Sequence, residues 1–259
     1  MFDQLRSAGR QARLLDHVEH RPWPPPDGRW TLGETLEDVF FAHWRVSPDA
    51  LRPLVPDDME IDRHGGSAWV GIVALRVTAL RGRGLLPVPG FSSFLQLNVR
   101  TYVRGRDDKP GVWFLSLDAS SRFAVEGARR RFALPFFHAR LSFDETGDWR
   151  DVECARIGER GRVFSGRCRA EGEETVPAPG SLEAFLVERY CLYATDRTGR
   201  LVRGEIHHEP WSLRGAEAEI ELATIAPVEL SGSAVCHVAA RQDLVLWPLE
   251  PVTATEAGG

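Results

Sequence analysis

The sequence predicts a mainly β protein of the α+β class, a barrel or double sheet with a few short helices and one N-terminal helix. Two observations carry this prediction. Short runs rich in β-branched and aromatic residues recur between residues 39 and 247, separated by turns rich in glycine, proline and aspartate. Apolar residues at helical spacing are confined to a few short segments. Many strands with few helices are typical of a β-barrel or β-sandwich.

The N-terminal segment 3–20 is expected to be a helix, because its apolar residues recur at helical spacing. The proline-rich stretch 22–28 must end this helix, since proline has no backbone donor and restricts the residue before it. We therefore expect residues 1–30 to form a helix and a tether and residues 31–250 to form a single β domain. The polar, glycine-ending tail 251–259 is expected to be disordered.

Strand signals follow one another along the expected domain. The first strand is expected at 39–46, and a short helix follows it, with Ser47 as N-cap and Pro48 at the first helical position. Two more short helices are expected at 120–134 and near 181–186. The turn 105–111 makes its two flanking strands a hairpin. The remaining expected strands are 68–80, 94–103, 112–118, 137–143, 161–168, 185–193, 200–209, 217–225 and 233–247.

The charge pattern excludes several classes of function. The formal net charge is −5 with both signs scattered, so the chain has no basic stripe for nucleic acid or for a membrane surface. The four cysteines are far apart, which predicts neither a metal site nor a redox motif. No run approaches the roughly 20 apolar residues of a membrane span. The N-terminus lacks the apolar core of a signal peptide, so a cytoplasmic location is expected.

One face of the strand 94–103 is polar, with Gln96, Asn98, Arg100 and Tyr102 alternating with apolar residues. Such a face either meets solvent or lines a cavity in which fixed polar groups orient a ligand. Arginine and tyrosine are large, directional hydrogen-bonding residues, which favours the cavity. On the paired strand, Trp113, Ser116 and Asp118 are further candidates, and Asp118 is expected to reach an arginine across the strands.

The histidines are candidates for proton transfer, because histidine titrates close to neutral pH. None of them has the spacing of a zinc site. A lone histidine is more often a structural residue whose ring is satisfied by hydrogen bonds than a catalyst or a ligand. The candidates in the expected strands are His43, His138 and His207.

Several motifs resemble those of the YqjF-like family, an uncharacterised family within the acetoacetate decarboxylase-like superfamily. They cover residues 40–212 and include AHWRVSPDALRPLVPDDMEI (42–61), NVRTYV (98–103), KPGVWFLSLDA (109–119), PGSLEAFLVERYCLY (179–193) and HHEPW (207–211). The resemblance implies an acetoacetate decarboxylase-like β-barrel or double-sheet cone that encloses a pocket. The similarity to true decarboxylases is confined to the fold and to residues 42–61.

The same resemblance implies that decarboxylase chemistry is missing. Arg45 falls where decarboxylases place an active-site arginine, but their two lysines fall near Leu117 and Asp118. The chain has a single lysine, Lys109, in a Pro-Gly turn beside acidic residues. Schiff-base decarboxylation needs a lysine amine of lowered pKa in the pocket, and neither leucine nor aspartate can replace it.

Two functions of the expected pocket stay open. One is an enzyme, a lyase, hydratase or hydrolase without Schiff-base chemistry, acting on a small carbonyl- or carboxylate-bearing molecule. The other is a non-catalytic protein that binds or senses such a molecule; a barrel filled by its own side chains is a third reading. We expect no metal and no cofactor, and a homo-oligomer stays open. The candidate catalytic residues are His43, Asp118, Glu188 and His207, and the candidate ligand-binding residues are Arg45, Asn98, Arg100, Tyr102, Trp113, Ser116 and His138.

Overall fold

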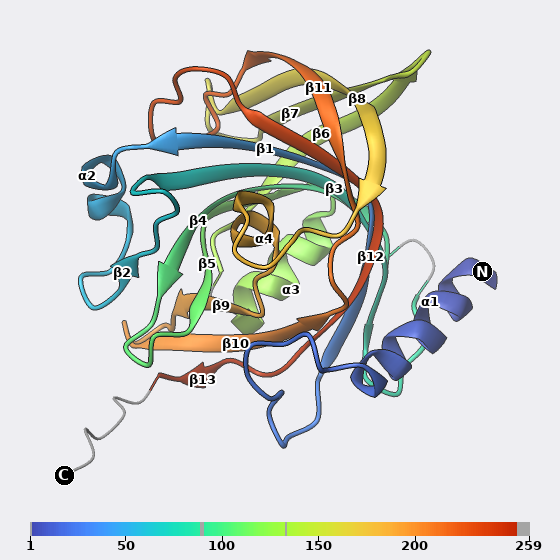
Figure 1. Cartoon of the computed structure of the whole chain (residues 1–259). Coiled ribbons are helices and arrows are strands. Elements are labelled where there is room, and N and C mark those ends of the chain that lie inside the picture. The colour runs from blue at the N-terminus through green and yellow to red at the C-terminus, as the bar shows by residue number, and fades with distance from the viewer. Residues whose placement is uncertain (1, 89–90, 133, 253–259) are drawn as a thin grey trace.

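Two β layers share a common wall in the computed structural model of the chain, which describes residues 2–88, 91–132 and 134–252 (Figure 1). The strands form one 13-stranded sheet. Their bounds are β1 (Leu32–Val46), β2 (Glu60–Ile61), β3 (Ala68–Gly82), β4 (Phe94–Arg104), β5 (Pro110–Ala119), β6 (Phe136–Thr146), β7 (Trp149–Arg156), β8 (Val163–Thr175), β9 (Cys191–Thr195), β10 (Leu201–His208), β11 (Leu213–Leu222), β12 (Val235–Leu246) and β13 (Glu250–Pro251).

The helices are short. Ser47 and Ser181 cap two of them, each accepting a hydrogen bond from a backbone N–H of the first turn, as serine at an N-cap commonly does. The α-helices are α1 (Phe2–Arg13), α2 (Pro48–Leu51), α3 (Arg122–Phe132) and α4 (Leu182–Val187), with 3-10 turns at Leu14–Asp16 and Arg52–Leu54. The predicted mainly β class with few short helices is confirmed.

The two layers arise because β5 and β12 each change partner along their length. The first half of β5 pairs with β9 and the last residues of β12 pair with β10, which closes a ring of β1, β3, β4, β5, β9, β10 and β12. The last residues of β5 pair with β6 and the first half of β12 pairs with β11, so β6, β7, β8 and β11 form a second layer outside the ring. Figure 1 shows this layer above the shared wall of β1, β3 and β4.

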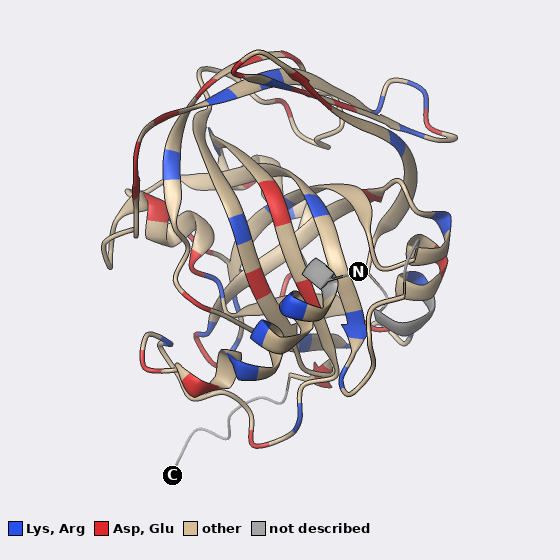
Figure 2. Ribbon diagram, turned by 90° about the vertical axis from the view of Figure 1, so that its right-hand side faces the viewer, with Lys and Arg blue, Asp and Glu red and all other residues tan. Residues whose placement is uncertain are grey.

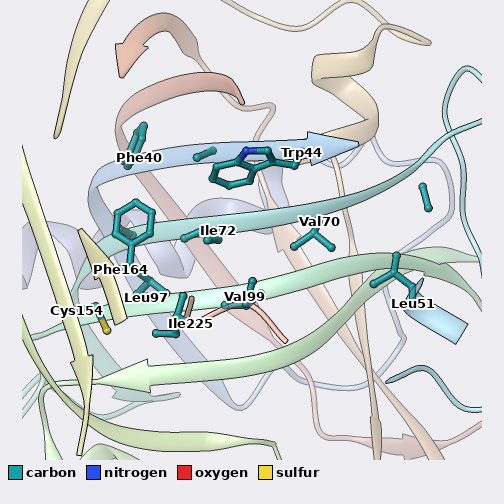
Figure 3. Packing of buried hydrophobic residues seen from close by; sticks show 14 of the residues in the cluster. Phe40, Trp44, Leu51, Val70, Ile72, Leu97, Val99, Cys154, Phe164 and Ile225 are labelled. Atoms are coloured by element: carbon teal, nitrogen blue, oxygen red, sulfur yellow. The ribbon is translucent and has the colours of Figure 1, made fainter. Parts of the chain in front are cut away.

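Because both faces of the shared wall are covered, its strands carry two separate cores. One set of alternating side chains packs against the second layer, where Phe40, Ile72 and Val99 meet Cys154 and Phe164 (Figure 3). The opposite faces of the same strands point into the ring and form the second core. The polar face of β4 therefore lies inside the ring and its apolar face lies between the layers.

Several elements differ from the prediction. β1 begins at Leu32, seven residues earlier than expected; Asp38 has a φ of 56° at an irregularity in the pairing with β3, which breaks the simple alternation there. β7 was not predicted. The segment from Leu182 to Val187 is helical, so the strand expected at 185–193 is reduced to β9.

The C-terminal end stays attached to the ring beyond residue 250. Pro251 pairs with Val202 in β13, and the N–H of Val252 donates to the carbonyl of Leu201 at 3.1 Å. The rest of the tail predicted to be disordered, residues 253–259, lies outside the described residues.

Candidate functional site

The ring of β1, β3, β4, β5, β9, β10 and β12 surrounds a cavity of about 500 Å³. Figure 1 shows α3 and α4 within the outline of this ring, and residues of α3 contribute to the lining. A cavity of this volume is typical of sites for small molecules. Every strand of the ring supplies apolar lining, including Phe41, Val73, Phe94, Phe114, Leu192, Ile206 and Leu244.

The cavity is more apolar than the polar face of β4 suggested in the sequence. Its hydrogen-bonding side chains come from β1, β4, β10 and the segment after α4. Besides the indoles of Trp211 and Trp247, they are Glu34, Gln96, Asn98, Arg100, Arg189 and His208. In such a cavity the few fixed polar groups orient a ligand, and the apolar surface supplies most of the affinity.

Arg100 is a cation in this lining without an anion beside it. Its Nη2 donates to the carbonyl oxygen of Leu186 at 3.0 Å, and its Nε has no hydrogen-bond partner among the described residues. Arg189 differs, because its Nη1 donates to a carboxylate oxygen of Asp62 at 2.7 Å in a buried ion pair. Arg100 is therefore the cavity arginine whose charge is free to meet an anionic group.

Other buried polar atoms near Arg100 also lack partners among the described residues: the side-chain oxygen of Asn98, the hydroxyl of Tyr102 and both ring nitrogens of His43. His43 and Tyr102 meet at Gly71, where an added Cβ would lie 2.9 Å from His43 Nε2 and 3.2 Å from the Tyr102 hydroxyl. Asn98 lines the cavity, whereas His43 and Tyr102 are fully buried behind it. Unsatisfied buried polar atoms are rare and mark where water or a ligand completes the hydrogen bonding.

Burial lowers the pKa of His43 well below its ordinary value, and the nearby Arg100 and His237 act in the same direction. Its ring is neutral at physiological pH. A neutral ring can donate from one nitrogen and accept at the other, but His43 does not line the cavity.

The histidine of β10 that lines the cavity is His208, the neighbour of the predicted His207. Successive side chains of a strand point to opposite faces. His207 points outward, with Nε2 2.8 Å from the carbonyl oxygen of Leu14. Burial lowers the pKa of each ring to about 4. Both are neutral at pH 7.

Glu34 lines the cavity and was not among the sequence candidates. It lies on β1 between Leu32 and Leu36, which share its face. No hydrogen bond or ion pair joins it to any described residue, and burial raises its pKa to about 7. The spacing of Leu32, Glu34 and Leu36 by two residues could have indicated a strand with Glu34 on its apolar face. The stretch 33–38 is largely polar, however, and does not resemble a strand.

Asp118 and Ser116 lie on the face of β5 turned away from the cavity, and Leu117 lines the cavity between them. Both oxygens of Asp118 accept from Arg156 of β7, at 2.8 and 3.0 Å, and one also accepts from the Ser116 hydroxyl at 2.9 Å. This buried pair joins β5 of the ring to β7 of the second layer. The arginine that Asp118 was expected to reach is therefore Arg156.

Glu188 lies outside the cavity lining, just after α4. Its carboxylate accepts from the hydroxyl of Tyr190 at 2.5 Å and from the backbone N–H of Trp211 at 2.8 Å. Burial raises its pKa, and these two hydrogen bonds oppose that shift. The side chain is satisfied within the fold.

Three other candidates are also outside the lining. Arg45 is exposed, with its guanidinium 5.3 Å from the centre of the Trp69 ring. The indole N–H of Trp113 donates to the carbonyl oxygen of Leu54 at 3.0 Å. His138 is half-buried on β6. Of the predicted ligand-binding residues, Asn98 and Arg100 line the cavity.

Lys109 lies outside the ring cavity, in the turn before β5. Its ammonium is 3.4 Å from a carboxylate oxygen of Glu205 and 5.2 Å from the centre of the Trp23 ring. It is the single lysine of the sequence, so no lysine amine lines the cavity.

Other types of site find little support in the described residues. Within residues 2–88, 91–132 and 134–252, no three histidine, cysteine or carboxylate side chains are placed to share a metal ion. None of the helices in this part of the chain is long and apolar enough to cross a membrane. Figure 2 shows acidic and basic residues interspersed along the ribbon.

Sequence comparison finds relatives over most of the chain. Residues 33–247 match the family DUF2071, described as an uncharacterized conserved protein. The uncharacterized protein YqjF of Bacillus subtilis (strain 168) is 40% identical over 240 residues, which cover 91% of this chain and 98% of YqjF.

Solved structures share the fold at low sequence identity. The enduracididine biosynthesis enzyme MppR, complexed with pyruvate, aligns with a TM-score of 0.64 and 13% identity over 91% of this chain and 94% of MppR. An acetoacetate decarboxylase from Legionella pneumophila aligns with a TM-score of 0.58 and 15% identity over 93% and 95% of the two chains. At these identities the likeness establishes an acetoacetate decarboxylase-like fold and leaves the chemistry open.

Proposed function

Because the chain belongs to the DUF2071 family and has an acetoacetate decarboxylase-like fold, we propose that its ring cavity binds a small, mainly apolar molecule through a carboxylate or carbonyl group. The protein acts on or holds this molecule without forming a Schiff base. The observation that carries the proposal is Arg100, a cavity-lining guanidinium with no carboxylate beside it among the described residues.

Arg100 and Asn98 together suit an oxygen-bearing group. Arg100 and the amide nitrogen of Asn98 are donors, and a guanidinium matches the planar oxygens of a carboxylate. The low polarity of the surrounding wall strengthens such a charge-assisted hydrogen bond. MppR has been solved with pyruvate, a carboxylate with an adjacent carbonyl, which supports this ligand class by analogy of fold.

The binding test uses straight-chain carboxylates, with octanoate as the first probe, in calorimetric titrations. We expect the variant Arg100→Leu to bind octanoate about 10- to 100-fold more weakly, the loss of one charge-assisted hydrogen bond. The matched control is Arg45→Leu, which removes an exposed arginine on β1. Equal affinity of wild-type protein and Arg100→Leu would contradict the proposal, and weakening by Arg45→Leu alone would move the site to Arg45.

A trapping experiment tests the absence of Schiff-base chemistry. Incubation with acetoacetate or pyruvate and borohydride is expected to leave the mass of Lys109-containing peptides unchanged, because that amine lies outside the cavity and beside Glu205. Acetoacetate is expected to persist in the same incubation without borohydride. A reduced adduct on Lys109, or release of carbon dioxide faster than without protein, would overturn this part of the proposal.

A non-catalytic binding or sensing protein is the second candidate. Its support is the position of the cavity histidine: the ring nitrogens of His208 lie 2.7 and 3.3 Å from the backbone carbonyl oxygens of Glu209 and Arg189, and the neutral ring donates its one N–H to one of them. A ring held by the backbone in this way is poorly placed to exchange a proton with a ligand. NMR spectra of a bound ligand recorded over hours distinguish the two, because turnover produces new resonances and binding alone does not.

A further inference from the structure

Glu34 is half-buried on β1 and lines the ring cavity, and it differs from the buried carboxylates of this protein in having no cationic partner among the described residues. Four acidic side chains among the described residues are buried, and each has a carboxylate oxygen within 3.1 Å of an arginine nitrogen. These four are Asp62, Asp118, Glu205 and Asp243. Glu34 has no such partner in the described part of the chain, although 31 arginines are present in the sequence. The carboxylate of Glu34 therefore has no positive charge beside it among the described residues.

The surroundings of Glu34 are apolar. Leu244 of β12 lies opposite it, and Leu32, Leu36 and Leu80 share the same part of the cavity lining. Burial is the one cause that raises its pKa to about 7; no nearby charge or hydrogen bond contributes. The carboxyl group is therefore close to half-ionised at neutral pH.

Glu34 and Arg100 lie far apart along the same cavity. Arg100 pairs with Gly71 of β3, whereas Glu34 lies between two residues of β1 that pair with Thr78 and Arg81. At the usual rise per residue, the seven residues from Gly71 to Thr78 span about 23 Å of strand. The lining between these two positions is mainly apolar.

The choice of a carboxyl group at this place restricts its role. A hydroxyl or an amide would supply a hydrogen bond without the cost of burying an acid. A carboxyl group adds negative charge, which stabilises a cation brought into the cavity. The apolar wall makes that attraction stronger than it would be in water.

We propose that Glu34 is a second anchor of the cavity and binds the basic nitrogen of an elongated ligand whose carboxylate or carbonyl group meets Arg100. This inference rests on the proposed function of the cavity and specifies the ligand further, as an apolar chain with an amine at one end and an oxygen acid or carbonyl at the other. The complex leaves neither Glu34 nor Arg100 without a counter-charge.

Proton release accompanies such binding. An ammonium group stabilises the carboxylate and lowers the pKa of Glu34, so the acid fraction present at pH 7 loses its proton. The other titratable side chains of the described lining are Arg100, Arg189 and His208. The arginines stay charged, and the pKa of His208 of about 4 leaves it neutral, so the released proton comes from Glu34.

The test compares ω-amino carboxylates of increasing chain length, from ω-aminooctanoate to chains of about 20 carbons that approach the roughly 23 Å of strand between the two anchors, with the unsubstituted carboxylate of each length, by calorimetry at pH 7. Wild-type protein is expected to bind the amino compound at the best chain length about tenfold more tightly than the parent carboxylate. In Glu34→Gln this preference is expected to vanish. The matched control is Glu37→Gln, on the same strand but outside the cavity lining, which is expected to keep it.

Titrations in two buffers of different ionisation enthalpy give the number of protons released. Release by wild-type protein and none by Glu34→Gln supports the inference. Arg100-dependent binding of octanoate with no gain from the amine, or with proton uptake, overturns the role of Glu34 and leaves the proposed function standing. Failure of every carboxylate in both series to bind overturns both.

Discussion

Replacing Asp118 with alanine is expected to lower the free energy of unfolding by about 3–5 kcal/mol, because it leaves Arg156 buried without its main partner. Asp118 is fully buried, and the side chain of Arg156 is 6% exposed. After the substitution, the remaining carboxylate at Arg156 is the half-exposed Glu159, 3.1 Å from Nη1. Urea unfolding of the variant and of wild-type protein measures the difference.

An exposed ion pair provides the control. Arg167 and Glu219 are each about half exposed, so Glu219→Ala is expected to change stability by less than about 1 kcal/mol. The double variant Asp118→Leu with Arg156→Met is expected to recover much of the loss, since no buried charge then lacks a partner. If Asp118→Ala is as mild as Glu219→Ala, the pair is not structural and the catalytic role suggested by the sequence returns.

Replacing Glu34 with glutamine is expected to stabilise the ligand-free protein above pH 7 by up to about 3 kcal/mol, the equivalent of the pKa shift from 4.5 to about 7. The raised pKa means that the folded protein holds a proton at Glu34 that the unfolded chain releases between pH 4.5 and 7. The wild-type protein therefore loses stability relative to the variant as the pH rises through this window. Below pH 4.5 both states are protonated and the penalty disappears.

Urea unfolding at pH 5 and pH 8 checks this expectation. The stability difference between Glu34→Gln and wild-type protein should be small at pH 5 and large at pH 8. Glu37→Gln, on the same strand but outside the cavity lining, is the matched control. A difference for Glu34→Gln that is equal at both pH values would mean that the carboxyl group is not buried in an apolar environment. A gain in stability on removing a side chain is common where that side chain serves function.

The sequence predicted the strands whose alternation is regular. The polar face of β4 was recognised as candidate cavity lining, and Asn98 and Arg100 do line the cavity. The hairpin of β4 and β5 was also recognised, because its turn residues stand between two clear alternating runs. These features depend on local sequence, so they could be predicted from it.

The face of a strand on which a given side chain lies was harder to predict. A shift of one residue moves a side chain to the other face, and this separates His208 in the cavity from His207 outside it, and Leu117 from Asp118. Glu34 was missed because the irregularity at Asp38 and the polar residues around it hide the first half of β1.

The closure of the ring was not visible in the sequence at all. It depends on β5 and β12 changing partners midway, so that β9 and β10 complete one layer while β6 and β11 begin the other. Such pairings join residues far apart in the chain, and local propensity contains no information about them. The family resemblance supplied what alternation could not, namely the expectation of an enclosed pocket.

A crystal structure of the protein with octanoate tests the central claim most directly. The account predicts the carboxylate within about 3 Å of the guanidinium of Arg100, the alkyl chain along the apolar lining towards Glu34, and no covalent bond to Lys109. Octanoate bound elsewhere on the protein while the ring cavity is closed by its own side chains would contradict it.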